Sequence, residues 1–293
     1  MSKPSASRRT VLAGLVAAAA GAPLLDTLTA APAHAADLYA SNTALYANAV
    51  EGVDFGRRFK RHELLDSSMT TNARPRLSSI LAIHGGNIER GTSELCLGIA
   101  GYHPATLAPV DKSAPLYDYW MLEGLLSKDN GRLHVTAENN DDPVARSIAA
   151  ASANVISVHG CTTDSAKLPA GTKAVIVGGA GRRLREALAV RLDRAGFTIA
   201  DTSPDKINGD APGNICNRTL TDEGGAQLEL TSELRESLFD DFGNAPDVNS
   251  PTLRSQNTNT RYWAFVNACR AALAEVEKAQ LDGPSIWHVP TPA

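Results

Sequence analysis

Residues 77–95 read LSSILAIHGGNIERGTSEL, and this stretch decides the fold. It begins with a short apolar run rich in branched side chains, which is typical of a strand buried on both faces of a sheet. The run ends at His84, two glycines then allow a tight turn or a close approach of the backbone, and a carboxylate follows at Glu89. A helix is expected to begin at Thr92 or Ser93. The stretch therefore predicts a strand, loop and helix with an imidazole and a carboxylate at the mouth of the unit.

A second strand pattern ends in the same way. Residues 154–160 read NVISVHG and place His159 at the end of another buried run. In open α/β sheets the crevice beyond the carboxyl ends of the strands is where ligands bind. Two imidazoles and one carboxylate suit a catalytic zinc ion, with a fourth position left for water. We therefore predict that His84, Glu89 and His159 hold one zinc ion.

Strand and helix patterns alternate along the rest of the chain. Strand patterns are found at 117–126, 174–181 and 226–231, and helix patterns at 94–102, 144–153, 182–195 and about 258–278. Residues 133–136 add a brief alternating segment that is typical of a strand. Because this order recurs, we expect an α/β fold of three layers (α/β/α), in which an open, largely parallel mixed sheet carries helices on both faces.

The first 35 residues are predicted to be a twin-arginine export signal. Arg8 and Arg9 precede an alanine- and leucine-rich segment, and the sequence Ala-His-Ala at 33–35 forms a small-x-small cleavage site. We expect residues 36–293 to form a single domain, secreted with the help of the twin-arginine export machinery. No later segment is apolar enough to span a bilayer, so no membrane partner is expected.

The charge of the chain excludes a general nucleic-acid-binding protein. The 28 basic and 32 acidic residues give a net charge of −4, and loss of the signal, which holds three basic residues and one acidic residue, changes it to −6. Nucleic-acid binding needs a basic surface instead.

Four cysteines leave two interpretations open. In an exported protein, Cys96, Cys161, Cys216 and Cys269 allow three disulfide pairings, and a bridge between Cys161 and Cys216 is conceivable because both lie beside predicted site residues. The alternative is four buried thiols that act as small apolar side chains.

Two further segments supply the remaining groups that a zinc hydrolase needs. In the strand pattern 226–231, Glu229 lies on the polar side, and it is predicted to be the general base. Arg218, with Asn217 or Asn214, is predicted to bind a substrate carboxylate. Each of these residues also has a plainer interpretation as a solvated surface group. Glu94 competes with Glu89, although a carboxylate in a first helical turn also serves the helix dipole. The remaining histidines are interpreted as structural, with His134 the best suited of them to line the site.

Taken together, the motifs resemble a known family. The strings ILAIHGGNIERGTSEL, LHVTAENNDDP, VISVHGC, VIVGGAG and NICNR…GGAQLELTSELR, spread over residues 78–235, resemble the poly-γ-glutamate hydrolases first seen in bacteriophages. The resemblance implies a zinc-carboxypeptidase-like enzyme and fold, with ligands at His84, Glu89 and His159 and a base at Glu229. It also implies that Asn217 and Arg218 form the carboxylate-binding pair. Asn87 departs from the pattern, in which a third glycine is more usual.

The resulting hypothesis is a secreted zinc hydrolase that cleaves amide bonds of poly-γ-glutamate. Because the polymer is a polyanion and the chain is acidic, several arginines would have to gather near the cleft: Arg182, Arg183, Arg185, Arg218 and Arg235. Two alternatives stay open. One is a deacylase or carboxypeptidase acting on a small N-acyl- or peptidyl-glutamate, and the other is a non-catalytic secreted binding protein.

Overall fold

A mixed sheet organises the part of the chain that the computed structural model describes, namely residues 37–62, 77–201, 204–205, 207–243 and 251–282. These residues lie in one compact unit, Ala31–Ala293. The predicted export signal at 1–35 falls outside the described residues. Among those that are described, no helix has the length and apolar character needed to cross a membrane.

Seven strands form the sheet within these ranges, in the order β1-β3-β2-β4-β7-β5-β6. Their bounds are β1 Phe55–Lys60, β2 Ser78–Gly86, β3 Asp118–Gly124, β4 Asn154–Cys161, β5 Ala174–Gly178, β6 Thr198–Ile199 and β7 Ala226–Thr231. The central strands β3, β2, β4 and β7 run parallel, whereas β1 is antiparallel to β3 and β5 is antiparallel to β7. The predicted open, largely parallel mixed sheet is confirmed.

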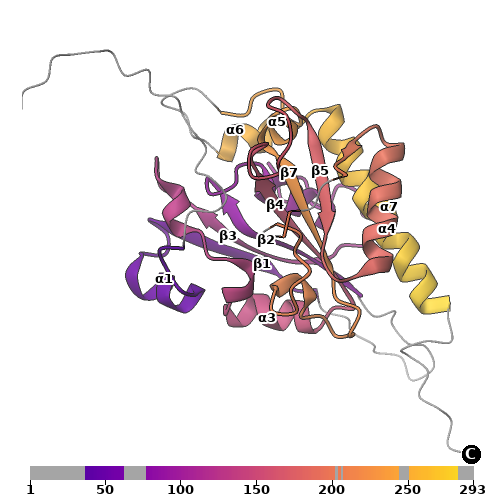
Figure 1. The fold of residues 1–293 in the computed structure, drawn as a ribbon, viewed down its shortest axis with the longest axis horizontal. Helices are drawn as coiled ribbons and strands as arrows, with labels where there is room; N and C mark the ends of the chain where they lie inside the picture. Colours follow the sequence, from indigo (N-terminus) through magenta and orange to yellow (C-terminus); the bar gives the residue numbers. More distant parts are fainter. Residues whose placement is uncertain (1–36, 63–76, 202–203, 206, 244–250, 283–293) are drawn as a thin grey trace, which may run out of the picture. The chain divides into compact units, whose positions relative to one another are not determined.

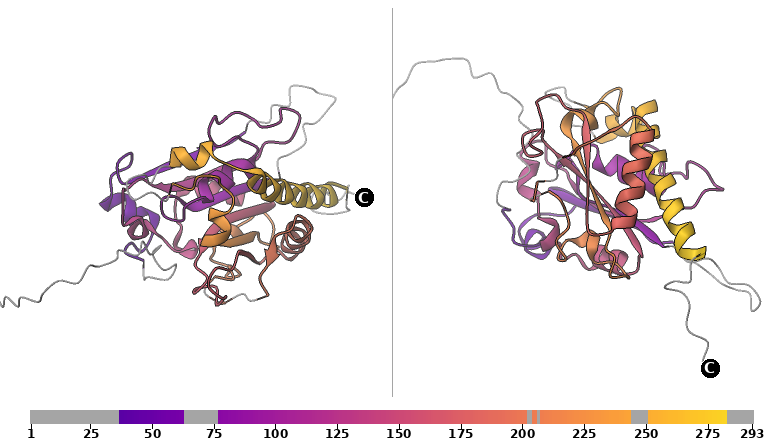
Figure 2. Two further views of the ribbon diagram at one scale, coloured as in Figure 1. Left: turned by 90° about the horizontal axis from the view of Figure 1, so that it is seen from above. Right: turned by 45° about the vertical axis from the view of Figure 1, so that its right-hand side comes forward.

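Helices cover both faces of the sheet (Figure 1). On one face lie α2 Thr92–Ala100, α4 Arg182–Arg194 and α7 Thr260–Asp282, and on the other lie α1 Asn42–Asn48 and α3 Pro143–Ala150. The right-hand view of Figure 2 shows α4 and α7 side by side. Two short helices, α5 Ser232–Glu236 and α6 Pro251–Gln256, follow β7.

The alternation of side chains along β2 explains why the sheet has a core on each face. Ile80 and Ala82 pack into the cluster under α2, α4 and α7, whereas Leu81 and Ile83 pack into the cluster under α1 and α3. Every residue of β2 is buried. Burial on both faces is what the continuous apolar run predicts, since a strand with one solvated face would alternate with polar residues.

Residues 133–136 were expected to form a strand, and this prediction is wrong. Leu133 ends the 3₁₀ helix η1 Asn130–Leu133, and residues 134–136 connect it to a second 3₁₀ helix, η2 Ala137–Asn139. Leu133 and Val135 do reach the core, which accounts for the alternation. The alternating polar residues, His134 and Thr136, are held by Asp37, which pairs with the ring of His134 and accepts a hydrogen bond from the backbone N–H of Thr136. These contacts with Asp37, about a hundred residues earlier, take the place of hydrogen bonds to a neighbouring strand.

The four cysteines are free and buried, so the alternative of apolar thiols holds and the disulfides do not form. Cys161 and Cys216, the pair that seemed able to bridge, belong to separate hydrophobic clusters. Burial raises the pKa of each thiol far above its usual value.

Candidate metal centre

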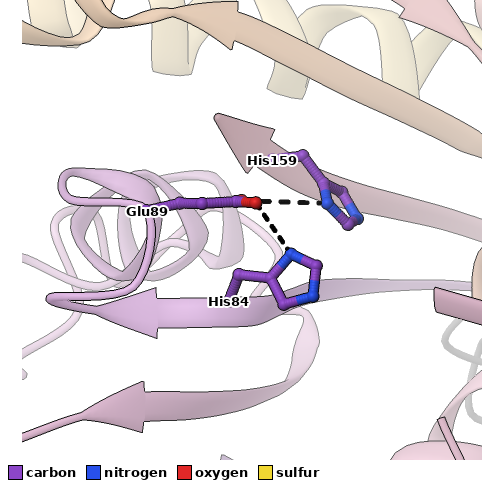
Figure 3. A group of neighbouring side chains, drawn as sticks. All are labelled: His84, Glu89 and His159. Atoms are coloured by element: carbon purple, nitrogen blue, oxygen red, sulfur yellow. Dashed lines mark hydrogen bonds and ion pairs between the residues drawn. The ribbon is translucent and has the colours of Figure 1, made fainter. Parts of the chain in front are cut away.

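Three side chains meet near the carboxyl ends of two neighbouring strands (Figure 3). His84 comes from the end of β2, Glu89 from the loop between β2 and α2, and His159 from the end of β4. One possible ligand atom from each lies within 4.8 Å of the others, so the three can share one ion. All three side chains are buried.

The loop that carries Glu89 is fixed by its own backbone. The N–H of Glu89 donates to the carbonyl of His84 over 2.9 Å, and the hydroxyl of Thr92 donates to the carbonyl of Glu89 over 2.8 Å. Gly85 is needed for this path, because a Cβ there would lie 2.4 Å from Ser93 Oγ and 2.9 Å from a backbone oxygen of β3. The turn therefore returns the carboxylate to the histidine five residues earlier.

Hydrogen bonds set which nitrogen of each histidine faces the centre. His84 Nε2 lies 2.9 Å from the carbonyl oxygen of Val135, which can only accept, so Nε2 carries a proton and Nδ1 faces Glu89 at 2.9 Å. His159 is arranged alike, with Nε2 2.9 Å from Ser157 Oγ and Nδ1 3.8 Å from Glu89 Oε2. Metal-binding histidines usually donate their other ring N–H in this way.

The electrostatics of the three groups favour a cation between them. Burial alone would raise the pKa of Glu89, but His84 and His159 lower it to about 2. Burial lowers the pKa of His159 to about 3 despite the nearby carboxylate. Burial also opposes a charge on His84, yet the field and hydrogen bond of Glu89 raise its pKa above the usual value. Glu89 thus favours a positive charge on His84, and a metal cation bound between these groups would supply such a charge.

Glu229 lies beside this cluster on β7. It is directly opposite His159 in the parallel pairing of β4 and β7, and its Oε1 is 3.9 Å from His159 Nδ1. Burial first, and then the charge of Glu89, raise the pKa of Glu229 well above its usual value. The polar side of this strand is therefore not solvated. A raised pKa suits a carboxylate that must take up and release a proton near neutral pH.

A pocket of about 120 Å³ opens onto these groups. His134 also lines it, and its ring stacks on His84 with 3.8 Å between the ring centroids. Its Nδ1 lies 2.7 Å from Asp37 Oδ1. Sequence analysis left His134 among the structural histidines, although as the best candidate to line the site. Its partner Asp37 is 97 residues earlier in the chain, so spacing could not reveal the pair.

The residues predicted to bind a substrate carboxylate differ in their position at the pocket. Asn214 lines it and donates to Gln227 Oε1 over 2.8 Å, and Gln227 in turn donates to Glu229. Asn217 and Arg218 do not line it. Arg218 donates to two carbonyl oxygens, those of Gly213 and Glu138.

The predicted gathering of arginines at the cleft is not found in the described part of the chain. None of the five arginines lines the pocket: Arg182, Arg183, Arg185, Arg218 and Arg235. The pocket lining includes three exposed carboxylates instead, from Glu138, Asp205 and Asp210. The competing Glu94 is also outside the site, since it is buried in the first turn of α2 and forms an ion pair with Arg254 at 3.3 Å.

A family model described as poly-gamma-glutamate hydrolase matches residues 39–268, most of the chain. The chain belongs to this family. The resemblance in its motifs is thereby confirmed, and membership of this family identifies the chain as a hydrolase.

Relatives and solved structures agree with this membership. The UPF0714 protein YmaC of Bacillus subtilis (strain 168) is 31% identical over 195 residues, which are 66% of this chain and 71% of YmaC. YndL of the same organism is 30% identical over 187 residues, 64% of this chain and 63% of YndL. A solved structure of zinc-free YndL has a TM-score of 0.64 and 27% identity, and covers 82% of this chain and 99% of that chain.

A bacteriophage poly-gamma-glutamate hydrolase has the same fold. Its structure has a TM-score of 0.65 and 24% identity, and the match covers 83% of this chain and 99% of that chain. The predicted α/β fold class is confirmed.

Proposed function

We propose that this protein is a zinc-dependent hydrolase that cleaves γ-glutamyl amide bonds, with poly-γ-glutamate as the substrate class. The observation that supports zinc is the buried cluster of His84, Glu89 and His159, whose possible ligand atoms lie within 4.8 Å of one another. Family membership supports the γ-glutamyl substrate.

The donor set fits zinc. Two imidazole nitrogens and a carboxylate are zinc ligands in catalytic sites. His84 and His159 would bind through Nδ1, because their Nε2 atoms are engaged with Val135 and Ser157. Zinc bound here would lower the pKa of a coordinated water to about 7 and polarise the substrate carbonyl.

The remaining chemistry falls to Glu229. Its buried carboxylate beside His159 would accept the proton of the attacking water and deliver it to the leaving amine. Gln227 holds Oε1 of Glu229 at 2.9 Å, which fixes the direction of the carboxylate. Removal of the proton makes the water a nucleophile, and its return makes the amine a better leaving group.

The substrate-binding roles of Asn214, Asn217 and Arg218 remain predictions. Arg218 is only partly buried and bonds the carbonyl of Glu138, a residue of the pocket lining, so its guanidinium lies near the mouth. Asn214 is the only one of the three in the described pocket lining. We place a glutamyl carboxylate between these two residues.

Export is part of the proposal. The twin arginine at Arg8-Arg9 and the Ala-His-Ala sequence at 33–35 support secretion through the twin-arginine route. A capsule-like polymer of γ-glutamate lies outside the cell, which suits a secreted hydrolase. Comparing the culture medium of strains with intact Arg8-Arg9 and with both changed to Lys tests this, since secretion should stop in the variant.

The function is tested by the size of the polymer. Purified protein loaded with zinc is incubated with poly-γ-glutamate, and products are followed by size-exclusion chromatography and by release of free amines. We expect shorter chains, loss of cleavage with a chelator, recovery with added zinc, and about one zinc ion per chain by elemental analysis. Glu229→Gln should retain zinc and lose turnover by about 10²–10⁴-fold. Turnover retained in that variant would contradict the role of Glu229.

A small substrate is the second candidate. The pocket volume of about 120 Å³ and the three carboxylates of its lining favour a short γ-glutamyl or N-acyl-glutamate amide over a long polyanion. A zinc-loaded protein that hydrolyses γ-glutamyl dipeptides but leaves the polymer intact would establish this alternative.

A further inference from the structure

One buried guanidinium contacts all three segments that carry the site. Arg235, in the last turn of α5, is only 6% exposed. Its donors reach four oxygens: Nη1 donates to Arg90 O over 2.8 Å, Nε to Leu230 O over 3.2 Å, and Nη2 to Ser232 Oγ over 3.2 Å and Cys161 O over 3.5 Å. Arg235 therefore connects the loop after β2 with the ends of β4 and β7.

Each of the three carbonyls belongs to a residue one or two positions after a site residue in the sequence. The carbonyl of residue 90 follows Glu89, that of residue 230 follows Glu229, and that of residue 161 comes two positions after His159. Because a planar guanidinium presents its N–H groups in a fixed fork, it holds these carbonyls at set angles to one another. A lysine ammonium, a single point on a flexible stem, cannot do the same.

Gly160 packs directly against this guanidinium. A Cβ at Gly160 would lie 2.4 Å from Arg235 Cζ and 2.5 Å from Nε, so Arg235 occupies the space that any other residue would need. The N–H of Gly160 also donates to Glu89 Oε2 over 2.8 Å. The glycine of the second His-Gly motif thus lies between the arginine and a carboxylate of the candidate metal centre.

Arg235 has no carboxylate partner at ion-pair distance in the described chain, and its acceptors are all carbonyl or hydroxyl oxygens. Burying a charge without such a partner is costly, and an apolar side chain would satisfy the fold at less cost. An arginine is therefore explained at this position by where its N–H donors lie, and not by a gain in general stability.

We propose that Arg235 is a positioning residue of the metal centre. It holds the backbone beside Glu89, His159 and Glu229, so that Glu89 and His159 converge with His84 on one ion and Glu229 lies beside it. This inference rests on the proposed function, because it needs a metal to be bound there.

The test is a pair of matched substitutions in the full chain. Arg235→Lys keeps the charge and loses the fork, so a change in zinc affinity reports geometry. Arg270→Lys is the control, since Arg270 also donates to two carbonyls, Ile99 O and Pro115 O, at 2.8 Å each, remote from the site. Zinc affinity is measured by competition with a chromogenic chelator, and unfolding of the metal-free protein by denaturant titration.

We expect Arg235→Lys to bind zinc about 10–100-fold more weakly, the usual range for groups that orient metal ligands, and Arg270→Lys to bind as the unchanged protein does. Equal zinc affinity in Arg235→Lys and the unchanged protein would overturn the proposal. So would an equal loss of affinity in the two lysine variants, because that would indicate a general effect on stability.

Gly160→Ala tests the same contact from the other side, and it carries the test if Arg235→Lys does not fold. Its Cβ would displace the guanidinium, so zinc affinity should fall by a similar factor. In a double variant with Arg235→Lys the two losses should not add, since both act through one contact. Additive losses, or an unchanged affinity in Gly160→Ala, would overturn the proposal. If the unchanged protein binds no zinc, both the proposed function and the positioning role of Arg235 are refuted. If it binds zinc and the affinity does not depend on Arg235, only the positioning role is refuted.

Discussion

Two regions of the site use their polar side chains differently: the ends of β2 and β4 with the loop that carries Glu89 (the strand side), and residues 214–218 (the loop side). On the strand side, His84, Glu89 and His159 are buried and face one another across less than 4.8 Å. On the loop side, Asn217 and Arg218 bond mainly to backbone groups of nearby loops. The strand side thus brings together groups that could share a metal ion, whereas the side chains of the loop side bond mainly to the chain itself. In this protein, polar side chains at strand ends indicate the chemistry of the site better than those of the loop at 214–218 do.

The largest effect is expected from removing a ligand on the strand side. His159→Ala should weaken zinc binding by more than about 100-fold, the upper limit for groups that only orient ligands, and hydrolysis should fall with it. The matched control is His103→Ala, since His103 lies away from the pocket and packs near Trp263. Elemental analysis and polymer cleavage check both variants. A His159→Ala protein with full zinc content would remove the distinction between the two sides.

A smaller effect is expected from pH, through His84. Zinc must replace the proton that the raised pKa of His84 keeps in place, so zinc affinity should fall about tenfold per pH unit below that pKa and level off above it. The metal-free protein should show the opposite trend. A raised folded-state pKa gives stability that is fully present below the ordinary value of 6.5 and is lost as pH rises through the raised value.

The two pH trends are separable by measurement. The pKa values of His134 and His159 are both lowered in the folded state, and about one pH unit above 6.5 these residues are also neutral in the unfolded state, so that among the three histidines only His84 then contributes. Denaturant titrations with a chelator, from about pH 7.5 upward, should show falling stability, and His84→Asn should make the fall less steep, with the raised pKa of Glu229 giving the remainder. Stability that rises over this window would show that His84 carries no proton in the metal-free protein.

Much of the strand side could be predicted from the sequence because its signals are local. The apolar run of β2, the glycines after His84 and the return to Glu89 all lie within thirteen residues, and backbone geometry fixes their relation. The second His-Gly lies on β4, a neighbour of β2 in a parallel sheet, so the two histidines reach the same edge. The boundary of α3 was equally local, with Asp142 capping the helix that begins at Pro143.

The features that sequence reasoning missed depend on partners far apart in the chain. His134 faces the pocket because Asp37 holds it, and Glu94 is buried because Arg254, 160 residues later, pairs with it. Arg235 was expected at the cleft to attract a polyanion but lies behind Gly160. Composition shows that these charges exist, but only the packing of distant segments decides which way each one faces.

The mouth of the pocket gives a prediction of intermediate size. Glu138, Asp205 and Asp210 should repel a polyanion, so changing all three to their amides should raise kcat/KM on poly-γ-glutamate by about tenfold at low salt. High salt should erase the gain, because screening removes the repulsion in the unchanged protein. The control removes three exposed charges from α4 and α7, through Glu186→Gln, Asp193→Asn and Asp282→Asn. An equal gain in the control would assign the effect to net charge and not to the mouth.

The smallest effect on catalysis is expected at Asn217, which tests the loop side directly. Its Oδ1 accepts from the N–H groups of Ala180 and Gly225, and its Nδ2 donates to the carbonyls of Gly209 and Ala211. Asn217→Ala should therefore lower the free energy of unfolding by about 1–3 kcal/mol, because it leaves several backbone groups without partners, while KM changes little.

The neighbouring residue provides the contrast. Arg218→Ala removes two hydrogen bonds to carbonyls but also a cation bonded to Glu138 of the pocket lining, so KM should rise with little change in stability. Denaturant titration and steady-state kinetics on a γ-glutamyl dipeptide separate the two variants. If Asn217→Ala instead raises KM at unchanged stability, the amide must turn from the backbone toward substrate, and the loop side would then bind ligand as the strand side does.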